Sequence, residues 1–271
     1  MSSNLLHAIH PAERAVSPAQ SVPASDRHLD PVLLAGWKAG AAVLLFAALL
    51  AGLLQYAGGD LWLADRIYRW QGGQWALRDT WLFSTVLHRG GHHLSVVAWL
   101  AVVATWAASG RCKIVPAHWR RPLGYLAVTV LASTLLVGLI KRCSGVDCPW
   151  DLLRYGGTHA YLAPFSPASL GQPGACFPAG HASAGYAWVA AGFALAANPR
   201  RARLAWALAI AAGLVFGISQ QIRGAHFLSH DIWTAALCWL VAARLFMLWR
   251  RRDPEASVGT PVRPGNARGG A

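Results

Sequence analysis

The chain of 271 residues is 55% hydrophobic, only 13% of its residues are charged, and its formal net charge is +13. An ordinary soluble domain carries about a quarter charged residues, so this composition excludes that class and favours a membrane protein. The positive charge does not indicate a nucleic-acid partner, because no segment resembles a nucleic-acid-binding module. The arginines lie where they would anchor membrane spans and attract anionic lipid headgroups.

A helix needs roughly 20 mainly apolar residues to cross the hydrocarbon core of a bilayer. Several stretches approach this length, and they predict an all-α, polytopic membrane helical bundle with about six transmembrane helices. In chain order the expected spans are 31–56, 93–109, 122–140, 182–197, 204–219 and 232–249. The first span lacks a small-residue cleavage pattern, so it is not interpreted as a removable signal peptide.

The membrane domain is therefore expected to cover residues 31–250. Residues 1–30 are rich in Ser, Ala and Pro, and residues 251–271 are rich in Gly, Pro and Arg. Both compositions are typical of disordered segments, which we expect in the cytoplasm.

Basic residues predict the orientation of the spans. Three clusters fall on one side of the membrane when six spans are threaded: 111–121, 200–203 and 250–252. The positive-inside rule makes this side cytoplasmic. The loops 57–92, 142–181 and 220–231 then face the periplasm of a bacterial inner membrane. The first of these loops is itself rich in arginine, so we expect it to be partly amphipathic and to lie on the bilayer surface.

Acids and histidines gather on the expected periplasmic side. Within residues 80–252 the only acids are Asp147, Asp151 and Asp231, and all three lie in periplasmic loops. The histidines expected there are His88, His92, His93, His159, His181, His226 and His230. Ionisable groups near membrane spans are functional candidates, so this distribution predicts a site at the periplasmic face.

Several groups on this side suit the binding of an anion. Lys141 ends the third span and Arg223 precedes the sixth, and both supply positive charge. Ala179 and Gly180 lead directly into a helix, where backbone amides can point at a phosphate. Lys141 alone equally fits a snorkelling anchor, and a Pro-Ala-Gly sequence is often an ordinary helix start.

Histidines on two different loops suit phosphoryl transfer. Two such histidines can serve as a nucleophile and a general acid, and a carboxylate beside a histidine can hold its tautomer. Phosphoryl transfer needs mainly positioning and charge neutralisation, which this set provides without a metal. Alternatively, His226 and His230, one helical turn apart, would ligate a metal together with a further histidine.

In order and spacing, these segments resemble the motifs of the type 2 phosphatidic acid phosphatase superfamily, which also includes vanadium haloperoxidases. That family carries Lys, six residues, then Arg-Pro; Pro-Ser-Gly-His; and Ser-Arg, five residues, His, three residues, Asp. The resemblance covers roughly residues 31–250. In the first motif Cys148 replaces Arg, and Arg142 and Arg154 are candidate substitutes, both out of register. In the second, Ala179 stands where the family has Ser.

The third motif departs most from the family pattern. With His226 as the nucleophile, Gln220 stands at the Arg position and His230 at the Asp position, with Asp231 one residue late. With His230 as the nucleophile, Gly224 and Thr234 stand there instead, which matches neither. We therefore assign the nucleophile to His226, with Arg223 as a substitute cation.

The resemblance implies a phosphatase that hydrolyses a phosphomonoester or pyrophosphate on a lipid or lipid-linked substrate, with no metal or other cofactor. His226 would attack phosphorus and form a phosphohistidine, oriented by Asp231 together with His230. His181 would protonate the leaving oxygen and later activate water, while Lys141 and Arg223 would neutralise the phosphoryl oxygens. A lipid-to-lipid phosphotransferase, a catalytically impaired scaffold and a transporter are the alternatives.

Two cysteines flank the first and second motifs on the expected oxidising side of the membrane. A disulfide between Cys148 and Cys176 is therefore expected, with two buried free thiols as the alternative. Cys143 is a third nearby thiol that could enter the pairing.

Overall fold

The computed structural model of the protein describes residues 31–110 and 115–251. The helices are α1 (Pro31–Tyr56), α2 (Gly59–Trp70), the π-helix η1 (Trp81–Gly90), α3 (Gly91–Ser109), α4 (Arg120–Cys143), α5 (Ser183–Tyr186), α6 (Ala190–Ala194), α7 (Pro199–Ile222) and α8 (Leu228–Arg251). Shorter 3-10 turns lie between them, and the described residues contain two isolated β-bridges but no strand. Apart from Arg251, the terminal segments expected to be disordered, 1–30 and 251–271, lie outside the described residues.

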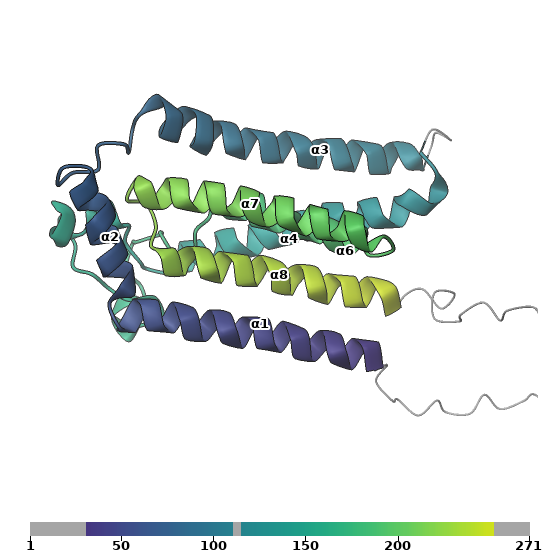
Figure 1. Ribbon diagram of the computed structural model, residues 1–271, viewed down its shortest axis with the longest axis horizontal. Coiled ribbons are helices and arrows are strands. Elements are labelled where there is room, and N and C mark those ends of the chain that lie inside the picture. Colours follow the sequence, from purple (N-terminus) through teal and green to yellow (C-terminus); the bar gives the residue numbers. More distant parts are fainter. Residues whose placement is uncertain (1–30, 111–114, 252–271) are drawn as a thin grey trace, which may run out of the picture.

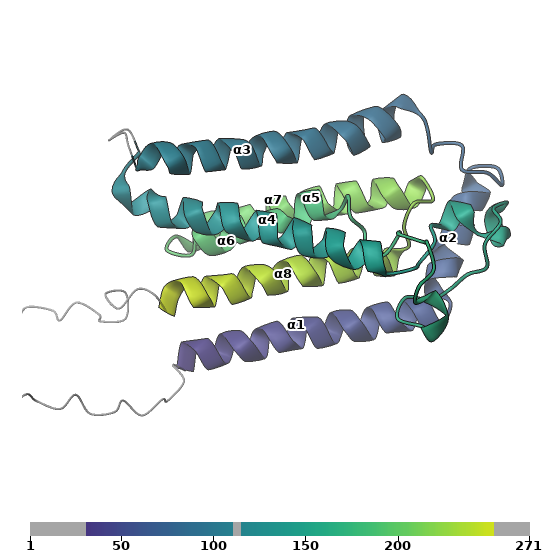
Figure 2. The same cartoon turned by 180° about the vertical axis from the view of Figure 1, so that it is seen from behind.

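The long helices run side by side, as the two opposite views show (Figures 1 and 2). α1 begins and α8 ends at the same end of the bundle, where α4 and α7 also begin. α2 and the loop between α4 and α5 cover the other end. The expected all-α membrane bundle is therefore confirmed, and its two ends differ in the structure that closes them.

Apolar side chains cover the outside of this bundle. Leu45, Phe46 and Leu49 of α1 are each more than 60% exposed, and Leu135 and Leu208 of other helices are equally open. Helices that are apolar on both their packed and their open faces are typical of proteins surrounded by lipid.

The expected number of six spans is not confirmed. Among the described residues, four helices are long and apolar enough to cross a membrane. A fifth is added if α1 and α2, bent by 63° at a short break, count as one span. The expected span 182–197 is instead divided into α5, a 3-10 turn over Ala187–Val189, and α6. Most of its residues are buried, so its apolar composition reflects packing within the protein.

Close approach of backbones places this broken segment against α7. A Cβ atom on Gly185 of α5 would lie only 2.3 Å from the backbone nitrogen of Gly213 in α7. Small residues at helix crossings permit such contact in membrane proteins. His181, two residues before α5, is thereby held beside the far end of α7 and the start of α8.

Candidate functional site

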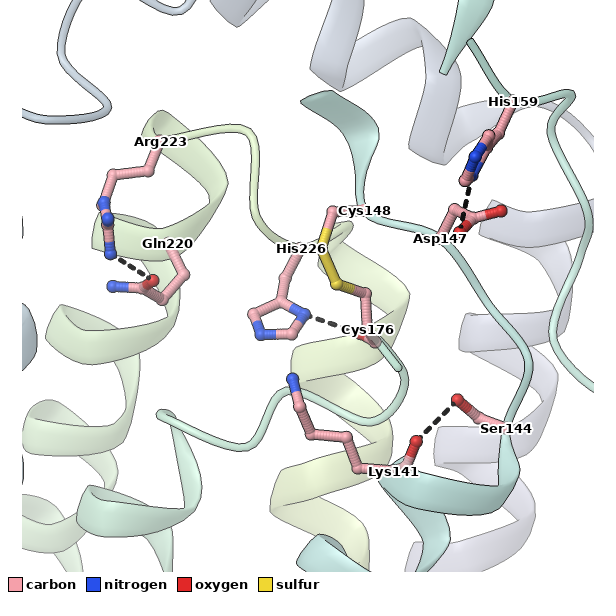
Figure 3. Close-up of a disulfide and its surroundings, with 9 residues drawn as sticks. All are labelled: Lys141, Ser144, Asp147, Cys148, His159, Cys176, Gln220, Arg223 and His226. Atoms are coloured by element: carbon pink, nitrogen blue, oxygen red, sulfur yellow. Dashed lines mark hydrogen bonds and ion pairs between the residues drawn. A yellow bond between two sulfur atoms is a disulfide. The ribbon is translucent and has the colours of Figure 1, made fainter. Parts of the chain in front are cut away.

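Loops at the α2 end bring the three motif segments together (Figure 3). A disulfide joins Cys148, after α4, to Cys176, before α5. The backbone nitrogen of Cys176 donates to the carbonyl of Val146 at 2.7 Å, beside a bridge between Val146 and Ala175. The nitrogen of Trp150 donates to the carbonyl of Gly224 at 3.0 Å, which ties the first segment to the third.

His226 lies between these loops and is only 5% exposed. Its Nδ1 atom is 2.7 Å from the carbonyl oxygen of Cys176. Because a carbonyl can only accept, Nδ1 must carry the proton, and the lone pair of the neutral ring is then on Nε2. The Nε2 edge faces the side on which Lys141 and Arg223 lie (Figure 3). Burial, reinforced by the nearby charge of Lys141, holds the pKa of His226 well below its usual value of 6.5.

Lys141 in the last turn of α4 lies along the backbone of Gly180. A Cβ atom on Gly180 would be 3.3 Å from Cδ and 3.9 Å from Nζ of Lys141, so only glycine leaves the side chain its full room. The ammonium group has no hydrogen bond or ion pair with the described residues. The backbone amides of Gly180 and His181 likewise donate to no acceptor among the described residues. An unneutralised cation beside two open amides forms a pocket that suits an anion.

Arg223, directly after α7, is held in place by two acceptors. Its Nε donates to the carbonyl of Arg78 at 2.7 Å and its Nη1 to Oε1 of Gln220 at 3.0 Å. Gln220, at the family's Arg position, therefore supports Arg223 as the cation next to the site. Both groups lie on the open side of the His226 ring (Figure 3). Arg223 is 8% exposed, and burial lowers the pKa of its guanidinium from the usual value.

His181 is fixed by a backbone carbonyl of the π-helix. Its Nε2 is 3.0 Å from the carbonyl oxygen of Leu87, so Nε2 carries a proton and any proton for transfer must be on Nδ1. Its ring packs on Phe216, with ring centroids 4.9 Å apart. Burial, and next the neighbouring His88, lower the pKa of His181 to about 4.

Asp231 does not take the role expected of it. Its Oδ2 accepts a hydrogen bond from Nε2 of Gln221 at 2.7 Å and lies against Gly217 of α7, where any Cβ atom would collide with it. The expectation that Asp231 orients His226 is therefore wrong, because the carboxylate faces α7 while the Cys176 carbonyl receives the His226 Nδ1 proton. Asp231 instead joins α7 to α8.

His230 is fully buried among aromatic rings. The Phe177, Phe227 and His226 ring centroids lie 5.2, 5.4 and 5.8 Å from its own. Neither ring nitrogen of His230 has a hydrogen-bond partner among the described residues, so it supports His226 by packing and not by a hydrogen bond. No group of three His, Cys, Asp or Glu residues in the described chain is arranged to hold a metal ion. In the described residues, no third His, Cys, Asp or Glu is placed to bind a metal ion together with His226 and His230, as the metal alternative requires.

Two expected phosphate ligands are engaged elsewhere. Arg154 donates from Nε and Nη2 to the carboxylate of Asp65 in α2, at 2.7 and 2.6 Å. This bidentate pair neutralises its charge, so the expectation that it replaces the motif arginine is wrong. The amide of Ala179 donates to the carbonyl of His230 at 3.4 Å, which leaves Gly180 and His181 to offer open amides.

The sequence reasoning missed the two acceptors that fix the histidines. The carbonyl groups of Cys176 and Leu87 belong to the backbone and have no signature in residue type. It also assigned no role to His88, whose ring centroid lies 4.4 Å from that of His181. The only signal for His88 was its place among the histidines of the expected periplasmic loops.

Two comparisons relate this chain to known proteins. The sequence model of the PAP2 superfamily matches residues 122–254. One solved structure, the first transmembrane PAP2 type phosphatidylglycerolphosphate phosphatase from Bacillus subtilis, is 18% identical over 79% of this chain and 94% of its own, with a TM-score of 0.44. A search among curated proteins found no significant match.

Proposed function

Because the sequence model of the PAP2 superfamily matches residues 122–254, we propose that this chain is a membrane phosphatase acting on a lipid phosphate through a phosphohistidine intermediate. The observation that carries the proposal is the environment of His226. Its Nδ1 proton is held by the Cys176 carbonyl, which leaves the Nε2 lone pair on the side of the Lys141 cation. A neutral, oriented imidazole beside an anion pocket is equipped to attack phosphorus.

The two histidines divide the reaction between them. Nε2 of His226 forms the bond to phosphorus as the bond to the leaving oxygen breaks, and a proton on Nδ1 of His181 passes to that oxygen. Neutral His181 then takes a proton from water, whose oxygen attacks the phosphohistidine and releases inorganic phosphate and free His226. Lys141, Arg223 and the open amides of Gly180 and His181 would neutralise the phosphoryl oxygens.

A cleft that begins at the anion pocket supports a lipid substrate. The cleft has a volume of ≈ 370 Å³ and lies between α3, α4 and the start of α5. Its walls are mainly apolar, and they include Val96, Trp99, Val130 and Leu131, with Gly180 at the pocket. A phosphate at Gly180 would place an attached hydrocarbon chain against these side chains, where it loses contact with water.

The periplasmic face of a bacterial inner membrane is the proposed location of this site. Arg120 at the start of α4, and Arg200, Arg201 and Arg203 at the start of α7, lie at the bundle end opposite the site. The positive-inside rule favours a cytoplasmic location for that end.

Phosphoenzyme trapping tests the proposal. Purified protein is mixed with labelled phosphatidic acid, phosphatidylglycerol phosphate or undecaprenyl pyrophosphate, with and without chelator, and quenched within one turnover. We expect phosphate release and an acid-labile phosphoenzyme in the wild type in either condition. His226→Ala should abolish both, and His230→Ala should leave both measurable, since His230 only packs against His226.

A matched control is His159→Ala, because His159 pairs with Asp147 away from the pocket. Phosphoenzyme that persists in His226→Ala and disappears in His230→Ala would show that the nucleophile is four residues further on. Turnover that EDTA abolishes and zinc or magnesium restores would favour a metal-dependent reaction. No release from any substrate would reject the phosphatase itself.

A further inference from the structure

His88 lies beside His181, the proposed general acid. It lies near the end of η1, and its ring centroid is 4.4 Å from that of His181. The positive charges of Arg223 and Lys141 both act on its ring, so His88 lies within range of both proposed phosphate cations.

The π-helix explains how His88 reaches this position. η1 covers Trp81–Gly90 directly before α3. π-helical turns are rare in proteins, and those that occur are often found at functional sites. Here the carbonyl of Leu87 receives the Nε2 proton of His181, while the ring of the next residue, His88, packs against the same imidazole. Two consecutive residues of η1, Leu87 and His88, therefore contact His181 directly.

One ring nitrogen of His88 is not satisfied by the protein. Its Nδ1 is buried and has no hydrogen-bond partner in residues 31–110 and 115–251. A buried polar nitrogen without a partner costs stability, and such atoms in native proteins often mark a place for a ligand or water. Ring stacking alone does not use this nitrogen.

The phosphoryl oxygens need more hydrogen-bond donors than Arg223 and Lys141 provide. Arg223 donates hydrogen bonds from Nε to the carbonyl of Arg78 and from Nη1 to Gln220. Its other terminal nitrogen, Nη2, is left to bind a ligand. Lys141 is a compact point charge that can satisfy only a few phosphoryl contacts. A phosphoryl group offers three equatorial oxygens, and charge builds up on them during transfer.

We infer that His88 is a phosphate-binding residue that takes up a proton when the phosphate enters and donates it in a charge-assisted hydrogen bond. The inference rests on the proposed phosphatase function and adds a third cation, present only in the loaded site. Charged or titratable neighbours of His88 are Arg89 and His92 on its own helical run, His181 before α5, Lys141 on α4 and Arg223 after α7. These neighbours are cationic or can become so, and they therefore oppose protonation of His88 until a dianion arrives.

Binding of inorganic phosphate with a proton count tests this role. Calorimetric titration of the full-length protein in detergent at pH 7.5, in two buffers of different ionisation enthalpy, gives the affinity and the number of protons taken up. We expect His88→Ala to weaken phosphate binding at least about tenfold and to lower the uptake by up to about one proton. His88→Gln, which can still donate a neutral hydrogen bond, should recover part of the affinity but not the proton uptake.

His88→Arg should bind phosphate at pH 7.5 with less proton uptake than the wild type, because its charge is permanent. The matched control is His93→Ala, since His93 is exposed on α3 and its ring lies beside that of His92. Equal affinity and proton uptake in His88→Gln and His93→Ala would overturn the inference. A wild type that neither binds phosphate nor hydrolyses lipid phosphates would instead reject the proposed function, so the two failures are distinguishable.

Discussion

At the scale of single residues, both proposed catalytic histidines are held by backbone carbonyls. Cys176 receives the Nδ1 proton of His226 and Leu87 the Nε2 proton of His181. A neutral carbonyl fixes a tautomer but stabilises an imidazolium less than a carboxylate does. This agrees with the depressed pKa of each ring, since burial opposes protonation and no anion compensates it.

These pKa values predict an acidic optimum for the proposed reaction. The pKa of His181 is about 4 in the empty site, so above roughly pH 5 the protein has no proton to give the leaving oxygen. The proton must then be taken up together with the substrate, whose phosphate has a second pKa of about 6. We expect kcat/KM to fall about tenfold per pH unit above pH 6, and to fall again below about pH 4 as the empty site becomes protonated.

Initial rates across pH 3.5–8.5 check this profile, with protein stability measured at each pH. A substrate whose phosphate has a lower second pKa should move the alkaline limb down by the same amount. A rate that stays constant or rises from pH 6 to 8 would contradict the assignment of the proton to the substrate.

At the scale of elements, the loops joined by the disulfide carry the carbonyl group that accepts from the proposed nucleophile, His226. Cys148 belongs to the loop after α4 and Cys176 to the loop before α5, and the bond between them fixes the carbonyl on which His226 depends. The same loop follows Lys141 by a few residues. The disulfide therefore connects the position of the cation to the orientation of the nucleophile.

Loss of this disulfide should reduce activity more than expression. In the double variant Cys148→Ser with Cys176→Ser we expect kcat to fall about ten- to a hundredfold, as misplacing a reacting group by about an ångström does. Cys143→Ser is the control, because Cys143 is an exposed free thiol in the adjoining turn. Nonreduced peptide mass spectra should show the bridge in the wild type. Alkylation of both thiols without reductant, or full activity of the double variant, would count against this link.

At the scale of the whole molecule, the two ends of the bundle differ in chemistry. The end with the starts of α4 and α7 carries arginines, and the other holds the pocket, the disulfide and the histidines. The proposed site thus lies at one end of the bundle and not at mid-depth, where a transporter would place its binding site.

Reporter fusions determine which end faces the cytoplasm. After Arg252, a reporter that works only in the cytoplasm should be active, and one that works only in the periplasm should be inactive. Near Ser166, in the loop between α4 and α5, the result should be the reverse. Both fusions are compared with the wild type for membrane insertion. The opposite pattern would reject the periplasmic location of the site.

The sequence by itself determined the class of the protein and the identity of most groups at the site. Apolar stretches of membrane length predict helices because the bilayer leaves backbone groups no partner except each other. The bounds of α1 agree with the expected span, and α4, α7 and α8 extend theirs by a few residues. The motif spacing selected Lys141, His181 and His226, with Arg223 as a substitute cation. Lys141, Arg223 and His226 surround one site in the structure (Figure 3), and His181 follows Gly180, which lies beside Lys141.

Only the tertiary structure decided how those groups are used. Asp231 and Arg154 have the right chemistry, but they bind Gln221 and Asp65, partners distant or unremarkable in the sequence. The span expected at 182–197 proved to be a broken, buried segment, because apolar composition is the same for a residue facing lipid and one facing a protein core. The acceptors of His226 and His181 are backbone carbonyls that every residue possesses, so their positions depend on the path of the chain and not on residue type.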